Sequence, residues 1–484
     1  MNFHPQKQIC PKCQGEGKRA QRISKKKRLL YQKALESFKA HSAGEEPPKP
    51  KAKTSVCIFC KGTGLLDCSD LNLGENNIEK TKESLDFPKV AIVGAGIGGM
   101  ALAVALFHRG IPFEIFEKDN HFSSRSQGYG LTLQQASRAL GGFGIEKLKN
   151  GVVSTRHLVL NPTGEVLGQW GYRKWLKEED TEENHKKSNI HIARQSLREE
   201  LMFELGGESQ IQWGHQLVFM KQNPHTKQME LHFLQNGNTK ITTADLVIGA
   251  DGIRSKVREL WLENQSKKPQ KPLRYLGCLV VLGICDLQGL VHPFLDGATV
   301  FQTANGIDRI YLMPYDKNSL MWQLSFPISE EKALEISQNG AEALKNIALE
   351  KTHLWHEPIG EILQNTPLNL ISGYPVYDRE LLEPKDLDSL EQTTLLGDAA
   401  HPMSPFKGQG ANQALLDALS LARIIYKQKD HWKKTSVREA ILQPFEAEML
   451  LRSAKKVKDS ARAVDILHSE VVLTKADRPR GKIL

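Results

Sequence analysis

The chain has 484 residues, of which 40% are hydrophobic and 25% charged, so a soluble globular protein of two or three domains is expected. No apolar run approaches the roughly 20 residues of a membrane span, and the N-terminus has no apolar signal core, so we expect no membrane span and no secretory signal, and a cytoplasmic location. Residues 1–64 carry 15 Lys and Arg against 4 Asp and Glu, so their net charge of +11 exceeds the +9 of the whole chain. The near-neutral remainder argues against nucleic acid as a partner.

Two copies of one cysteine motif mark the N-terminal part. Cys10-Pro-Lys-Cys13 and Cys57-Ile-Phe-Cys60 each continue as x-Gly-x-Gly, so CxxCxGxG occurs twice. Two residues between cysteines let both thiolates of a turn face one ion, and two such turns supply four sulfurs for a structural zinc site. The motif is similar to the zinc repeats of DnaJ-type chaperones, which implies one zinc ion and not chaperone activity. A redox-active dithiol is the alternative.

A helix is predicted between the two cysteine motifs. Apolar residues recur at helical spacing from Ser24 to Ala40, with Ser24 as a suitable N-cap. Its basic run, 25–28, is expected to be a solvated face, with a contact to phosphate or to an acidic partner as the alternative. Polar, aperiodic stretches at 43–53 and 69–88 are predicted linkers.

The stretch after Lys89 predicts a dinucleotide-binding turn. An apolar strand, 90–93, leads into Gly94-x-Gly96-x-x-Gly99 and then into an apolar helix. Gly94 would make the tight turn, Gly96 would let the backbone approach a pyrophosphate, and Gly99 would let the helix pack on the strand. Strand, glycines and helix in this order predict a bound dinucleotide.

A carboxylate follows the next predicted strand. Residues 112–116 are mostly apolar and lead to Glu117, 23 residues after Gly94, where a carboxylate can accept hydrogen bonds from ribose hydroxyls. A loop begins at Lys118, and an amphipathic helix opens near Arg194.

The strands predicted within 272–330 suggest a mostly antiparallel sheet that would form a wall for a substrate, and the middle of the chain as a whole is rich in predicted strands. They are a hairpin at 152–170 and strands at 211–221, 228–235, 279–285, 298–303, 309–314 and 320–327. Tyr311 and Trp322 lie in them and are candidates to stack on an aromatic ring or to pack in the core. Residues 330–350 are predicted to be helical.

Two later strand ends carry an acidic residue beside glycine. A buried strand at 244–250 leads into Asp251-Gly252, where the tight turn needs glycine. A second strand ends at Gly397-Asp398, where Asp398 is placed to hold a ribityl or ribose hydroxyl. The adjacent His401 is interpreted as structural rather than catalytic.

The chain then turns through prolines into a glycine-led helix. Pro402 and Pro405 precede Phe406, and Gly408-Gln409-Gly410 open the helix. Free amides at such a helix start suit the pyrimidine side of a flavin, which becomes anionic on reduction. A C-terminal amphipathic helix, 443–473, is expected to pack on the body through Leu450, Leu451, Ala454 and Val457.

This set of motifs resembles the group A FAD-dependent monooxygenases, the para-hydroxybenzoate hydroxylase-like family, over roughly residues 88–425. The resemblance implies an α/β fold with a discontinuous Rossmann-like FAD-binding domain and a mostly antiparallel substrate domain. The small N-terminal zinc-knuckle module, predicted from the cysteine motifs, departs from the pattern of this family. The predicted parts are a zinc-knuckle module at 1–68, a linker at 69–88, an FAD-binding domain at 89–265 and 375–425 with 150–188 on the substrate side, a substrate domain at 266–374, and a helical segment at 426–484.

The resemblance also implies roles for individual residues. Pro402, Pro405 and Phe406 would shape the pocket on one flavin face, and no protein side chain is assigned as a catalytic acid or base. The zinc ligands predicted from the two cysteine motifs, and not from this resemblance, are Cys10, Cys13, Cys57 and Cys60. The cofactor-binding residues implied are Gly94, Gly96, Gly99, Glu117, Lys118, Arg194, Asp251, Gly252, Asp398, Gly408, Gln409 and Gly410.

The activity implied is hydroxylation of an aromatic or polycyclic small molecule. NAD(P)H would reduce FAD, and dioxygen would then form a flavin hydroperoxide that donates a hydroxyl group. A flavin reductase or dehydrogenase of the same superfamily is one alternative, and a redox-sensing flavoprotein tethered through its zinc module is another. The Trp-x-Trp-x-Ile-Pro stretch of flavin halogenases does not occur. The zinc module could also dock a protein partner.

Overall fold

The computed structural model describes residues 7–41, 47–50, 52–68, 86–124, 129–171, 173, 189–266, 272–387, 392–429 and 431–480. Most of the linker predicted at 69–88 lies outside these residues, as does part of the linker predicted at 43–53. Within the described chain, no helix combines the length and the apolar character that a bilayer span requires.

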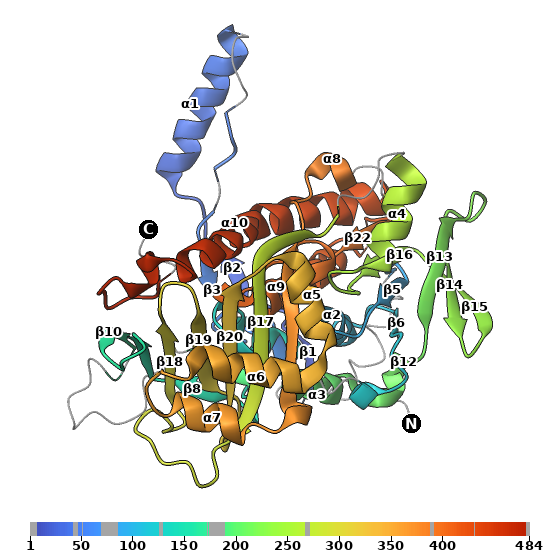
Figure 1. The fold of residues 1–484 in the computed structure, drawn as a ribbon. Helices are drawn as coiled ribbons and strands as arrows, with labels where there is room; N and C mark the ends of the chain where they lie inside the picture. Colours follow the sequence, from blue (N-terminus) through green and yellow to red (C-terminus); the bar gives the residue numbers. More distant parts are fainter. Residues whose placement is uncertain are drawn as a thin grey trace.

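A five-stranded parallel sheet is the first layer (Figure 1), in the order β12-β6-β5-β16-β22. The strands are β5 (Val90–Val93), β6 (Phe113–Phe116), β12 (Ile211–Gln212), β16 (Leu246–Gly249) and β22 (Thr393–Leu395). The three strands β5, β16 and β22 are buried along their whole length, as expected for a parallel sheet covered on both faces. The chain goes from β5 to β6 on one side and adds β16 on the other, and ligands bind where connections diverge in this way.

Four helices belong to this layer: α2 (Ile97–Phe107), α3 (Arg194–Leu205), α4 (Lys256–Ser266) and α9 (Gly410–Lys427). The helix α2 packs against α3 and α9. It carries apolar or small residues on all sides, and ten of its residues are buried. Such a helix is stable only when neighbours cover it all round.

A seven-stranded sheet is the second layer, in the order β10-β9-β18-β19-β20-β17-β21. All neighbours are antiparallel except β9 and β18. The strands are β9 (Arg156–Leu160), β10 (Val166–Trp170), β17 (Arg274–Asp286), β18 (Thr299–Ala304), β19 (Arg309–Pro314), β20 (Ser319–Pro327) and β21 (Ile371–Asp378). The predicted boundary between residues 374 and 375 therefore falls inside β21.

The two faces of this sheet have different partners. One face packs on α5 (Glu330–Gln338), α6 (Gly340–Thr352) and α7 (Ile359–Asn365), which lie in front of the strands in Figure 1. The other face carries Met313, Met321 and Val376, and packs towards Tyr129 and Phe406 of the first layer. This second face lies beside Phe406, which precedes Gly408 and the start of α9, and is the one that can meet a ligand.

Smaller elements connect the layers. One small sheet joins β7 (Gly130–Leu133), β11 (Asn189–Ala193) and β8 (Val152–Ser154), and a meander joins β13 (Gln216–Gln222), β14 (Met229–Gln235) and β15 (Asn238–Ala244). The short helices are η3 (Phe122–Ser124), η4 (Gln135–Phe143), η6 (Glu208–Gln210), η7 (Leu368–Leu370), α8 (Pro384–Leu387), η8 (Gly397–Ala399), η9 (Pro405–Lys407), the π-helix η10 (Arg438–Leu442) and η11 (Glu470–Leu473).

The cysteine module, residues 7–68, consists of two short ribbons and one helix. The strands β1 (Lys7–Ile9) and β4 (Leu65–Asp67) pair, as do β2 (Lys18–Ala20) and β3 (Thr54–Val56). The helix α1 (Lys25–His41) stands away from the rest of the molecule (Figure 1). The backbone amide of Lys27 donates to Ser24 Oγ over 3.4 Å, so Ser24 caps this helix as predicted.

Three local predictions need correction. The strand predicted at 211–221 is divided by a turn at Gly214, where φ is +69°, and the polar strand β15 was not predicted. The C-terminal helix α10 (Gln443–Leu467) buries Leu450, but Leu451 is 83% exposed. Adjacent helical positions lie about 100° apart, so the two leucines cannot both face the body.

Candidate functional site

A different steric constraint explains why each of the three positions after β5 is a glycine. Gly94 adopts φ +104°, and a β-carbon there would lie 2.6 Å from the carbonyl oxygen of Ala250. A β-carbon at Gly99 would lie 1.9 Å from the carbonyl oxygen of Gly94. At Gly96 the nearest atom would be 3.9 Å away, on Arg194. Gly94 and Gly99 are therefore required by the fold, whereas Gly96 leaves open space at the start of α2.

That open space suits a pyrophosphate. Gly96 is the N-cap of α2, and no side chain caps the helix start. The first amides of a helix need acceptors, and the helix dipole favours an anion there. The residues present therefore fit the phosphates of a dinucleotide.

Glu117 holds the loop in shape. Its carboxylate accepts a hydrogen bond from the backbone amide of Ala95 at 2.7 Å and one from that of Asp119 at 3.1 Å. An ionised carboxylate has about four acceptor positions, so room remains for hydroxyl groups. The neighbouring Lys118 is exposed.

Arg194 is brought to the glycine loop by the small sheet. It is the first residue of α3, and its backbone amide donates to the carbonyl oxygen of Tyr129 at 3.0 Å. One turn later, the buried Arg198 donates from Nε to the carbonyl oxygen of Ala95 at 3.3 Å. Sequence reasoning did not single out Arg198, although its spacing of four from Arg194 places both on one helix face.

Asp251 caps a helix in addition to its predicted role in cofactor binding. Its Oδ2 accepts hydrogen bonds from the backbone amides of Lys256 at 2.7 Å and Val257 at 3.1 Å, which caps α4. The buried Oδ1 has no hydrogen-bond partner among the described residues. Burial raises the pKa of this carboxyl, and hydrogen bonding from Ser255 opposes the rise. Gly252 follows with φ +82° and open space around it.

The loop that carries Asp398 rests on a buried charged network. Asp417, in α9, accepts hydrogen bonds from the backbone amide of Gly397 at 2.9 Å and from Arg452 at 2.8 Å, and it meets His401 Nε2 at 2.7 Å. Burial alone would raise the pKa of Asp417, but His401 and Arg452 lower it overall. The interpretation of His401 as structural fits this contact, while Asp398 itself is exposed.

The start of α9 is tied to the loop after β7. The side chain of Gln409 donates to Gln134 Oε1 at 2.7 Å and accepts from Gln135 at 3.0 Å. Asn412, which is fully buried, accepts from the amide of Gln134 at 2.9 Å and donates to the carbonyl oxygen of Gly408 at 2.8 Å. The side chain of Gln409 is thus engaged with protein, and only its backbone is free to face a ligand. Asn412 was missed because one polar residue inside a helix gives no signal.

Of the predicted pocket residues, Phe406 packs against the open face of the seven-stranded sheet. Pro402 is buried, whereas Pro405 and Phe406 are half-buried. The guanidinium carbon of Arg309 lies 6.0 Å from the ring centre of Phe406 and 5.0 Å from that of Tyr311. Arg309 is 4% exposed, and within the described chain the one hydrogen bond of its guanidinium runs from Nε to Gln302 Oε1. Burial lowers the pKa of Arg309 to about 10, so it is a cation at neutral pH.

Trp322 lies on the opposite face of the sheet from Tyr311. Its indole is fully buried, donates to Thr366 Oγ1 at 2.9 Å, and fills the space beside Gly283. It packs in the core under α5–α7 and cannot stack on a ligand from there. Of the two aromatic candidates, Tyr311 alone faces Phe406, because side chains alternate along a strand.

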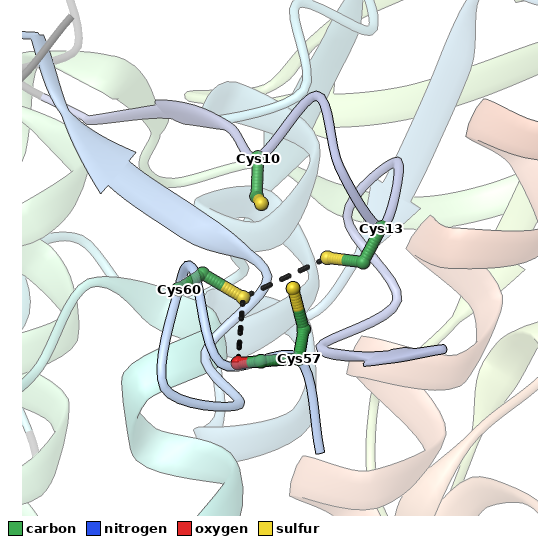
Figure 2. A group of neighbouring side chains, drawn as sticks. All are labelled: Cys10, Cys13, Cys57 and Cys60. Carbon is green, nitrogen blue, oxygen red and sulfur yellow. Dashed lines mark hydrogen bonds between the residues drawn. The ribbon is translucent and has the colours of Figure 1, made fainter. Parts of the chain in front are cut away.

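A separate candidate metal centre lies in the cysteine module. The sulfur atoms of Cys10, Cys13, Cys57 and Cys60 are all buried and lie within 4.8 Å of one another (Figure 2). The sulfurs of Cys13 and Cys60 are 3.6 Å apart. Four sulfurs at 2.3 Å from a tetrahedral zinc ion are separated by about 3.8 Å. The donor set and its spacing therefore fit Zn²⁺.

The glycines of the two motifs make the centre nearly symmetric. The amide of Gly17 donates to Cys13 Sγ and the amide of Gly64 to Cys60 Sγ, both at 3.3 Å. A β-carbon at Gly17 would lie 2.2 Å from the oxygen of Gly62, and one at Gly64 would lie 2.3 Å from the oxygen of Gly15. Each turn therefore packs backbone to backbone on the other, which explains why the motif repeats its glycines.

Comparison with known proteins identifies the body of the chain. The family described as FAD binding domain matches residues 88–457. The chain is 28% identical to an aurachin C monooxygenase/isomerase of Stigmatella aurantiaca, over 69% of this chain and 80% of the relative. It is 26% identical to a 6-hydroxynicotinate 3-monooxygenase of Pseudomonas fluorescens, over 71% of this chain and 84% of the relative.

Solved structures share the same fold. The structure of 2,6-dihydroxypyridine-3-hydroxylase from Arthrobacter nicotinovorans aligns with a TM-score of 0.65 at 19% identity, over 80% of this chain and 94% of that chain. HpxO of Klebsiella pneumoniae, complexed with FAD and uric acid, aligns with a TM-score of 0.64 at 20% identity, over 78% and 88% of the two chains. The α/β fold predicted from the sequence is confirmed. The chain belongs to the FAD binding domain family and is an FAD-dependent monooxygenase.

Proposed function

We propose that this monooxygenase uses NAD(P)H and dioxygen to hydroxylate an aromatic or polycyclic small molecule. The observation that carries the proposal is the meeting of two surfaces: the glycine loops at the ends of the parallel strands, and the open sheet face that bears Tyr311 and Met313 and packs against Phe406 of η9. A flat ring system fits between a cofactor and an apolar wall lined with aromatic and methionine side chains.

In this proposal FAD lies along the glycine loops. The start of α2 at Gly96 would hold the pyrophosphate, Glu117 the adenosine ribose, and Arg194 would lie beside the phosphates. Asp398 and the backbone of Gly408–Gly410 would face the ribityl chain and the flavin ring. When bound, FAD supplies the redox chemistry and the activation of dioxygen. The protein's part is to bind, to orient the substrate and to exclude water.

Arg309 indicates a further property of the substrate. It is a buried cation with unused N–H groups next to Tyr311 and Phe406. Burying a cation is costly unless a partner compensates it. We therefore expect the preferred substrate to carry an acidic group or a strong hydrogen-bond acceptor that reaches Arg309.

We also propose that the cysteine module holds one structural zinc ion through Cys10, Cys13, Cys57 and Cys60. The buried sulfurs, their spacing and the two amide-to-sulfur hydrogen bonds support zinc over a redox dithiol. A reducing compartment such as the cytosol is part of the proposal, since these thiols must stay reduced to bind metal.

Aerobic oxidation of NADPH and NADH by the FAD-loaded protein tests the function. The substrate panel pairs acids with neutral analogues, for example 4-hydroxybenzoate with 4-hydroxybenzamide, and hydrogen peroxide is measured alongside. A true substrate accelerates NAD(P)H oxidation and lowers the yield of peroxide per NAD(P)H, and the acid of a pair outperforms its amide. Flavin reduction without any oxygen transfer across the panel would instead favour a reductase.

A further inference from the structure

The part of the chain that matches the FAD binding domain family, residues 88–457, is called the flavin body here. The cysteine module contacts the flavin body through two arginines of that body. Arg109 follows the last turn of α2, and it donates from Nη2 to the carbonyl oxygen of Gly15 at 3.4 Å. Arg423, in α9, donates from Nε to the same oxygen at 3.1 Å. The Nη2 of Arg423 would lie 3.3 Å from a β-carbon at Gly17. Both guanidinium groups therefore lie on the first turn of the metal centre.

Among the residues that the structure describes, these arginines are not paired with carboxylates. Arg109 is 3% exposed, and its Nε has no hydrogen-bond partner among the described residues. Within the same part of the chain, neither arginine has a carboxylate oxygen within 4 Å. The charged or ionisable neighbours of Arg109 are Arg423, Glu16, Tyr426 and Cys13. One half-buried glutamate faces two cations, so positive charge is left over.

A metal-bound centre would balance that charge. Four thiolates around one Zn²⁺ carry a net charge of −2, whereas four neutral thiols carry none. Buried cations are tolerated when an opposite charge is close and are costly without it. Two arginines and one glutamate leave a charge of about +1, which is opposite in sign to the −2 of the zinc tetrathiolate and offsets part of it.

The same contacts link the metal centre to both cofactor loops. The helix α2 begins at Gly96 and α9 at Gly410, and the two helices pack on each other. Arg109 and Arg423 lie towards the opposite ends of these helices. A third contact comes from Thr63, whose Cγ2 would lie 2.7 Å from a β-carbon at Gly141 in η4.

We propose that Arg109 and Arg423 are second-sphere cations of the zinc tetrathiolate, and that zinc binding is thereby coupled to FAD retention through α2 and α9. The inference rests on the proposed FAD and zinc sites. Without the metal, the buried Arg109 and the half-buried Arg423 lose their counter-charge, and the helices that carry the cofactor loops are less well held. The cysteine module is then a structural part of the flavin site.

The test uses the full-length protein. Zinc content is measured by mass spectrometry, zinc affinity by competition with a chelator, and FAD affinity by flavin fluorescence. Outer contacts of a metal site are worth about 10–100-fold in metal affinity. We expect Arg423→Gln to weaken zinc by about tenfold, Arg423→Lys to fall between Gln and wild type, and the exposed Arg28→Gln in α1 to leave both affinities unchanged. Zinc removal and Cys13→Ser should each weaken FAD binding by about tenfold.

Unchanged FAD affinity after zinc removal would overturn the coupling and leave both proposed sites standing. Equal zinc affinity in Arg423→Gln and Arg28→Gln would overturn the second-sphere role. A purified protein that binds FAD but never zinc would also overturn the inference, without touching the monooxygenase proposal. Failure to bind FAD at all would instead count against the proposed function.

Discussion

Within the loop Gly94-x-Gly96-x-x-Gly99, we expect Gly99 to be needed for folding and Gly96 for cofactor binding. A methyl group at Gly99 would collide with the Gly94 carbonyl at 1.9 Å, but one at Gly96 would meet nothing within 3.9 Å. We expect Gly99→Ala to lower the free energy of unfolding by about 1–3 kcal/mol, as overpacking does. Gly96→Ala should leave the FAD-free protein as stable as wild type and weaken FAD by tenfold or more. Thermal unfolding without FAD and a fluorescence titration distinguish the two; equal stability losses would contradict this assignment.

The two aromatic candidates of the sheet give a second contrast at the same scale. Trp322→Ala removes a fully buried ring from the core under α5–α7 and should cost about 3–5 kcal/mol of unfolding free energy. Tyr311→Phe removes one hydroxyl on the opposite face, beside Arg309 and Phe406. It should leave stability nearly unchanged and alter the KM for the aromatic substrate. A KM effect from Trp322→Phe equal to that of Tyr311→Phe would show that the faces are misassigned.

At the scale of elements, the loop that presents Asp398 depends on α9 and α10. Asp417 joins Gly397, His401 and Arg452, and removing its charge leaves Arg452 without this partner. We expect Asp417→Asn to cost about 3–5 kcal/mol at pH 7, as breaking a buried pair does. The measurement is denaturant unfolding, with Arg462→Gln on the same helix α10 as a control away from this network.

The pH dependence of that loss has a defined sign. Because the folded pKa of Asp417 is lowered, its contribution is complete well above the ordinary carboxyl pKa of 3.8 and is lost as the pH falls through the folded pKa. The gap in stability between wild type and Asp417→Asn should therefore stay constant from pH 7 to about pH 5 and narrow below about pH 4. A gap that narrows between pH 7 and pH 5 would assign the effect to another group.

Elements also show how far sequence reasoning reaches. The strand β5, its three glycines and α2 are specified by adjacent residues, and β19 was predicted with its observed bounds because its pattern is local. The network of Asp417, His401 and Arg452 joins residues up to 51 positions apart, and no local pattern announces it. Leu450 is buried and Leu451 is exposed because only one face of α10 meets the body, and tertiary packing determines which face that is.

At the scale of the whole molecule, we expect removal of the helix α1 and disruption of the metal centre to have different effects. The turns of the metal centre contact α2, α9 and η4, whereas α1 stands away from the body. The chain enters and leaves this arm at neighbouring points, because the amide of Gln21 donates to the carbonyl oxygen of Lys53 at 2.7 Å. A two-residue Asn-Gly turn can therefore replace residues 22–52 and close the hairpin.

We expect this deletion to leave zinc content, FAD affinity and the melting temperature of the body unchanged, because the replaced arm lies beyond the turns that contact α2 and α9. The physical change would be the loss of basic charge, including Lys25, Lys26, Lys27 and Arg28, which weakens retention on a cation exchanger. The matched comparison is Cys13→Ser, which leaves α1 in place and removes a predicted metal ligand. If the arm deletion weakened FAD as much as Cys13→Ser, the stabilising part of the module would extend into α1. If it has no effect, α1 is free to serve an acidic partner without involving the flavin site.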